Sequence, residues 1–101
     1  MERLNNIHPG EILKLDFLDP LGITPYRLAK DIGVPQTRIS QIIRGKRPIT
    51  LDTAIRLGRY FNITPQFWLN LQTHYNIEEL RLGNMVDYEQ IRPFSKQTVA
   101  A

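Results

Sequence analysis

The chain has 101 residues, of which 42% are hydrophobic and 23% are charged, a composition typical of one soluble globular domain. It contains no cysteine, which excludes disulfide frameworks, thiolate metal sites and cysteine nucleophiles. No apolar run approaches the about 20 residues that a membrane-spanning helix needs. The first residues also lack the basic start and apolar stretch of a signal peptide. We therefore expect a soluble, cytoplasmic protein without a membrane partner.

Basic side chains are concentrated in the middle of the chain. The formal net charge is +3, yet residues 24–59 hold eight basic against two acidic residues, and the remainder holds five against eight. A basic segment inside an otherwise slightly acidic chain is typical of a surface that meets phosphate-rich partners. Charge alone does not separate a nucleic-acid partner from a solvated surface that happens to be rich in arginine.

Capping residues and apolar periodicity predict an all-α chain of five helices with no strand. The predicted helices span residues 9–18, 25–32, 35–43, 51–61 and 65–82. Threonine side chains are expected to cap the second, fourth and fifth helices, at Thr24, Thr50 and Thr64. In the first helix, Leu13 and Phe17 lie four residues apart and are expected to share the inner face. The fourth helix is expected to bury a stripe that contains Leu51, Ala54, Ile55 and Gly58.

The periodic signal weakens from Gly83 onward. We therefore divide the chain into a helical domain, residues 1–82, and a C-terminal tail or partner-dependent segment, residues 83–101.

Residues 28–47 contain two short amphipathic helices that meet at a tight turn. Gly33 suits the left-handed backbone that often ends a helix. The second of these helices carries one apolar stripe of three isoleucines, Ile39, Ile42 and Ile43. Its opposite face offers amide, hydroxyl and guanidinium groups that can hydrogen-bond base edges and phosphates. This arrangement is what a helix-turn-helix requires.

The pattern resembles a known family. Residues 24–62 are similar to the lambda-repressor-like, or Xre-type, helix-turn-helix domain. The His-Pro-Gly-Glu at 8–11, the segment 45–50 and the Thr-Pro-Gln-Phe-Trp-Leu-Asn-Leu-Gln at 64–72 resemble the HigA/VapI branch of antitoxins. The match covers about residues 7–76. It implies a lambda-repressor-like five-helix domain with a short C-terminal extension.

The resemblance also implies a function. Such antitoxins are homodimers that bind operator DNA, repress their own operon and neutralise a small RelE-like toxin that cleaves mRNA on the ribosome. By similarity, the third helix is the recognition helix, and its base-reading residues are Gln36, Thr37, Arg38 and Gln41. Candidates for contacts with the DNA backbone are Thr24, Tyr26, Arg27, Ser40, Arg44, Lys46 and Arg47. Pro35 departs from the family pattern, since a Ser or Thr that contacts phosphate often stands there.

The remaining chemistry-bearing residues have simpler interpretations. Phe67, Trp68 and Tyr75 repeat at helical spacing and are expected to be core or dimer-interface residues rather than a ligand site. His8 and His74 have no second ligand three or four residues away, so we expect no metal and no cofactor. No catalytic constellation stands out, so the sequence does not predict an enzyme.

Two alternatives to the antitoxin remain. The first is a stand-alone Xre-type repressor of the same fold that has no toxin partner. The second is a helical interaction module that does not touch DNA, in which another protein or the chain's own dimer partner covers the basic face.

Overall fold

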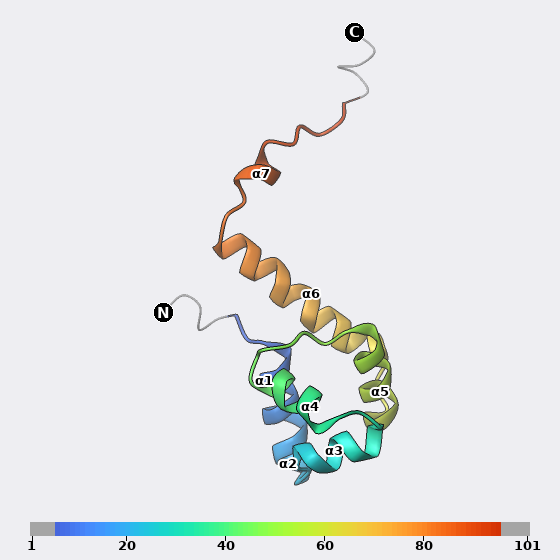
Figure 1. The fold of residues 1–101 in the computed structure, drawn as a ribbon. Coiled ribbons are helices and arrows are strands. Elements are labelled where there is room, and N and C mark those ends of the chain that lie inside the picture. Colours follow the sequence, from blue (N-terminus) through green and yellow to red (C-terminus); the bar gives the residue numbers. More distant parts are fainter. Residues whose placement is uncertain (1–5, 96–101) are drawn as a thin grey trace.

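The computed structural model describes residues 6–95, and every regular element in that range is a helix. In chain order these are α1 (Pro9–Ile12), the π-helix η2 (Leu13–Leu18), α2 (Asp19–Leu21), α3 (Pro25–Ile32), α4 (Gln36–Ile43), α5 (Leu51–Phe61), α6 (Pro65–Leu82) and α7 (Val86–Glu89). The elements up to the first half of α6 form a bundle, and the rest of α6 and α7 extend away from it (Figure 1). The predicted all-α class is confirmed. No helix in the described range is long and apolar enough to cross a membrane.

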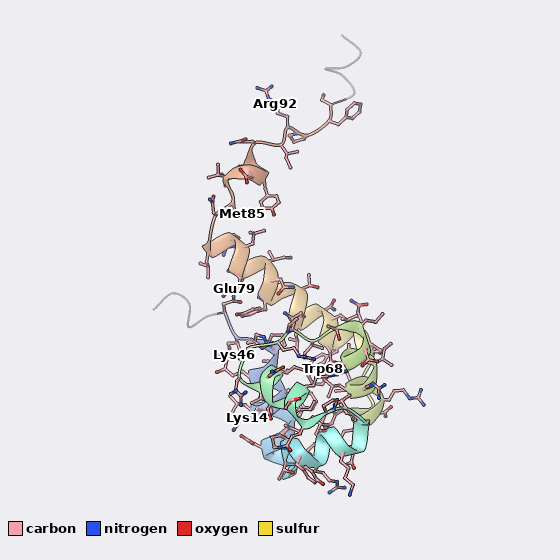
Figure 2. The ribbon with its side chains drawn as sticks, in the orientation of Figure 1. Lys14, Lys46, Trp68, Glu79, Met85 and Arg92 are labelled. Carbon is pink, nitrogen blue, oxygen red and sulfur yellow. The ribbon has the colours of Figure 1, made fainter. Side chains whose placement is uncertain are left out.

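The core of the bundle is built by η2, α3, α4, α5, α6 and the loop before α5. Its buried apolar residues are Leu13, Leu18, Leu28, Ala29, Ile32, Ile39, Ile42, Ile49, Ala54, Leu57 and Trp68. The indole of Trp68 is fully buried, with its ring centroid 4.9 Å from that of Phe17 and 5.0 Å from that of Phe67 (Figure 2). Tyr75 is half-buried and meets the ring of His8 edge-on at 4.8 Å. The aromatic residues of α6 therefore pack within this chain.

The first predicted helix is longer than expected and is wound differently. Elements α1, η2 and α2 form one continuous helix that ends at Gly22, whose φ is +68°. In η2 the backbone hydrogen bonds span five residues instead of four. This winding turns both Leu13 and Leu18 into the core, where they are fully buried, whereas Phe17 is only half-buried. The expected pairing of Leu13 with Phe17 on one inner face is therefore only partly right.

The other helix ends follow the prediction with three differences. Thr24 caps α3 by accepting the backbone N–H three residues on, at 3.0 Å, as predicted. Thr50 and Thr64 precede α5 and α6 without making such a side-chain bond. Pro35 is the N-cap of α4, so that helix begins at Gln36, one residue later than predicted.

The predicted stripe of α5 is wrong at two positions. Ala54 and Gly58 are buried as expected, but Leu51 is 60% exposed and Ile55 is 42% exposed. The helix instead turns Thr53 inward, where it is 1% exposed. Two large apolar side chains of α5 are thus left at the surface of the single chain.

The winding of η2 makes a direct prediction about stability. Leu18→Ala should lower the free energy of unfolding by about 2–5 kcal/mol, because it empties a fully buried site. Leu15→Ala, in the same π-helix but 54% exposed, should change it by less than about 0.5 kcal/mol. Urea unfolding of both variants measures the difference, and equal losses would contradict the winding.

Candidate nucleic-acid interface

Helices α3 and α4 are joined by a turn of three residues, Gly33–Pro35. Gly33 takes a left-handed backbone, with φ +76°, and its N–H donates to the carbonyl of Ala29 at 2.9 Å. The N–H of Val34 donates to the same carbonyl at 3.0 Å. The turn thus has little freedom, and it fixes the angle at which α4 leaves α3.

The inner face of α4 is anchored in the core. Ile39 and Ile42 are fully buried, and Ile43 is half-buried. Behind them α1 approaches so closely that a Cβ on Gly10 would overlap the carbonyl oxygen of Ile42. Only glycine permits this contact, so the first helix braces the back of α4 directly.

The opposite side of α4 is open. Gln36 and Thr37 are exposed, and Ser40 and Gln41 are half-buried. These side chains carry amide and hydroxyl groups, which both donate and accept hydrogen bonds. The predicted base-reading residues Gln36, Thr37 and Gln41 thus remain at least partly accessible on this helix.

Arg38, the fourth predicted base reader, lies on the same helix and is half-buried, but its guanidinium is bonded to α5. Its Nη1 donates to Asp52 Oδ2 at 2.6 Å and to Thr53 Oγ1 at 3.4 Å, and its side chain is only 25% exposed. It precedes the buried Ile42 by four residues, so it flanks the inner face of α4 rather than opposing it. In this structure the guanidinium of Arg38 holds α4 to the start of α5.

Asp52 is shared between two guanidinium groups. Besides Arg38, the Nε of Arg56 donates to it at 3.1 Å, and Nη1 of Arg56 donates to the last carbonyl of α3, that of Ile32, at 2.7 Å. The hydrogen bond from Arg38, and then the one from Arg56, hold the pKa of the Asp52 carboxyl below its ordinary value. This network ties the ends of α3, α4 and α5 together.

The predicted backbone-contact residues fall into two groups. The first is at the start of α3, where Thr24 caps the helix, Tyr26 is 60% exposed, and Nε of Arg27 donates to Asp31 at 2.8 Å. The second group lies on α4 and in the loop that follows it, and comprises Ser40, Arg44, Lys46 and Arg47. The last three of these are exposed, and Lys46 lies at the edge of the bundle in Figure 2.

The loop after α4 is held by a residue that sequence reasoning missed. Gln72 is 7% exposed, and its Oε1 accepts the backbone N–H of Ile49 at 2.8 Å. Its Nε2 donates to Asn76 Oδ1 at 2.9 Å. The available signal was its position four residues after Trp68, on the buried side of α6. Gln72 thereby fixes the far end of the loop that carries Lys46.

The described residues contain no cluster of three or more His, Asp or Glu side chains that would hold a metal ion. His8 instead caps α1, because its Nδ1 accepts the N–H of Gly10 at 2.9 Å. Burial lowers the pKa of His8, although the nearby Glu11 acts in the opposite direction.

Known proteins share this arrangement of helices. Residues 16–68 match the family model described as helix-turn-helix. The chain belongs to the Xre-type helix-turn-helix family. It is 50% identical to virulence-associated protein I of Dichelobacter nodosus over 72 residues, which cover 71% of this chain and 67% of that protein.

Antitoxins are among the relatives. The chain is 36% identical to antitoxin HigA-1 of Vibrio cholerae over 84 residues, which cover 83% of this chain and 79% of that protein. The solved structure of Pseudomonas aeruginosa antitoxin HigA with the higBA promoter is 40% identical, with a TM-score of 0.83, and covers 90% of this chain and 100% of that one. The predicted resemblance to the HigA/VapI branch is confirmed.

The role of Gln72 can be tested by stability. Gln72→Ala should lower the free energy of unfolding by about 1–3 kcal/mol, because it leaves the buried N–H of Ile49 without its acceptor. Gln66→Ala removes only an exposed bond to Asn70 on the same helix and should cost less than about 0.5 kcal/mol. Thermal or urea unfolding separates the two, and a negligible effect of Gln72→Ala would remove Gln72 from this role.

Proposed function

We propose that this chain is a sequence-specific DNA-binding antitoxin of a type II toxin–antitoxin system. It represses its own operon and neutralises a RelE-like toxin that cleaves mRNA. The observation that carries the proposal is the anchoring of α4 by Ile39 and Ile42, which leaves Gln36 and Thr37 exposed. The HigA relative solved with its promoter supports the DNA partner. The protein acts as a binding protein rather than an enzyme, in the cytoplasm where the operon lies.

Recognition works through α4 in the major groove. Gln36, Thr37 and Gln41 hydrogen-bond base edges, and Arg38 joins them by exchanging Asp52 for a base. Pro35 has no N–H, so the first backbone donors at this helix end belong to Gln36 and Thr37.

Phosphate contacts supply most of the affinity. Arg44, Lys46 and Arg47 reach one part of the backbone from the loop after α4. Thr24 adds a hydroxyl that already accepts an N–H but retains its own hydrogen for a phosphate oxygen. Binding therefore weakens steeply with salt, because each neutralised phosphate releases condensed counterions.

Base readers and phosphate binders should respond differently to truncation. Gln36→Ala should weaken binding to the chain's own promoter by about 1–3 kcal/mol and relax the preference at one base pair. Lys46→Ala should weaken binding to all sequences alike and make the salt dependence shallower by about one charge. Titrations against promoter and scrambled duplexes at several salt concentrations measure both. A base-selective loss from Lys46→Ala, or an unchanged preference with Gln36→Ala, would contradict these roles.

The active species is a homodimer. Two copies of α4 then enter successive major grooves about 34 Å apart on a palindromic operator. The aromatic residues Phe67 and Trp68 of α6 pack against other residues of the same chain. The proposed contact with the second copy is therefore made by Leu51 and Ile55, the exposed apolar residues of α5. An open hollow of about 620 Å³ beside Ile55 offers room for an apolar side chain of the second copy.

The dimer contact is tested with two separate variants, one that places a negative charge at Ile55 and one that places it at an exposed site on another helix. Ile55→Glu should shift the chain toward the monomer and weaken promoter binding, because it places a charge in an apolar contact. Leu21→Glu, at a 61% exposed site on α2, should leave both unchanged. Sedimentation equilibrium reports the mass. A dimer of unchanged strength in Ile55→Glu would place the interface elsewhere.

The sequence predicts that residues 83–101 are a tail or a partner-dependent segment apart from the domain of residues 1–82, and we propose the second role. Within its described part, four large apolar side chains are exposed on and after α7: Val86, Tyr88, Ile91 and Phe94. Exposed apolar residues in this number favour a covering partner. Residues 1–5 and 96–101 lie outside the described range.

A further inference from the structure

The outer side of the first helix carries a groove that the DNA-binding surface does not use. It is lined by Ile7, Glu11, Ile12, Leu15 and Asp16 and holds about 300 Å³. Ile7 is 50% exposed and Leu15 is 54% exposed, although both are large and apolar. Exposed apolar side chains that gather in a hollow mark interaction sites more often than ordinary surface.

The π-helix accounts for part of this groove. The π-helix η2 turns both Leu13 and Leu18 into the core. Leu15 and Asp16, which lie between them in the sequence, are left exposed. The floor of the groove is therefore set by the same winding that fills the core.

Acidic side chains border the apolar floor. Glu11 and Asp16 line the groove itself and are both exposed. Lys14, the base between them, is engaged with Asp19 at 2.9 Å. These carboxylates repel phosphate, so the groove is not an extension of the DNA interface.

The second half of α6 brings one acid, Glu79, to the residue that precedes Ile7. Nδ2 of Asn6, the neighbour of Ile7, donates to Glu79 Oε2 at 2.7 Å. The edge-on contact between His8 and Tyr75 holds the same two segments together. Figure 2 places Glu79 on α6 near the beginning of the described chain.

We propose that this groove binds the toxin, through apolar side chains that are flanked by lysine or arginine. The inference rests on the proposed antitoxin function. A protein that cleaves mRNA needs a cationic surface to hold phosphates, and the acidic border complements that charge. The groove shares no residue with the proposed base readers or phosphate binders. The chain can therefore hold toxin and operator at the same time.

The test uses the full chain and the product of the reading frame next to its gene, each purified free of the other. Leu15→Arg places a positive charge on the groove floor, and Leu21→Arg places the same charge at an exposed site on α2. Titration calorimetry should give a dissociation constant about tenfold higher or more for Leu15→Arg and an unchanged one for Leu21→Arg. Promoter binding should be equal in the two variants, because both add one charge.

Each other outcome is decisive. If wild type binds the neighbouring product and Leu15→Arg binds it equally well, the groove is not the toxin site, and the antitoxin function stands. If wild type does not bind that product, the antitoxin function fails, the stand-alone repressor replaces it, and the groove proposal falls with it. If Leu15→Arg does not fold, the paired variant Glu11→Gln with Asp16→Asn decides. It should weaken toxin binding at low salt and reduce its salt dependence, and unchanged binding would overturn the proposal.

Discussion

The burial of Ile39 and Ile42, on the inner face of α4, is the constraint on which the other features depend. Each fully buried side chain of this size contributes roughly 1.5–3 kcal/mol. The stripe fixes the rotation of α4 about its axis, since one residue of slip turns the helix by about 100° and would carry polar groups into the core. Gly10 behind α4 and the left-handed Gly33 before it remove the remaining freedom. The face available to a duplex is therefore a consequence of packing.

Most of the fold was predictable because its signals are local. The bounds of α3, α5 and α6 follow from caps, helix-breaking residues and apolar periodicity, and the structure has them where the sequence predicts. The π-helix was not predictable in this way. A period of 3.6 pairs Leu13 with Phe17, whereas the packed core selects Leu18, five residues on. The exposure of Ile55 has the same origin, because it depends on which side of α5 meets the other helices.

The candidate site was predictable where it depends on exposure and missed where it depends on distant partners. Gln36, Thr37 and Lys46 are exposed, as a helix with one apolar stripe and a polar loop predicts. Arg38 belongs to the same polar set by composition, but its partner Asp52 is 14 residues away and on another helix. Such a pair cannot be found from periodicity.

The structure also separates two charge environments, a basic surface after α4 and an acidic groove on the first helix.

The most direct test of the central claim is a titration of the isotope-labelled chain with a duplex from its own promoter, followed by amide and side-chain NMR. The anchored α4 predicts that the largest shifts fall on Gln36, Thr37 and Lys46, while Glu11 and Leu15 in the groove change little. If the largest shifts fall on the first helix and α4 stays unchanged, the outer side of α4 is not the surface that meets DNA.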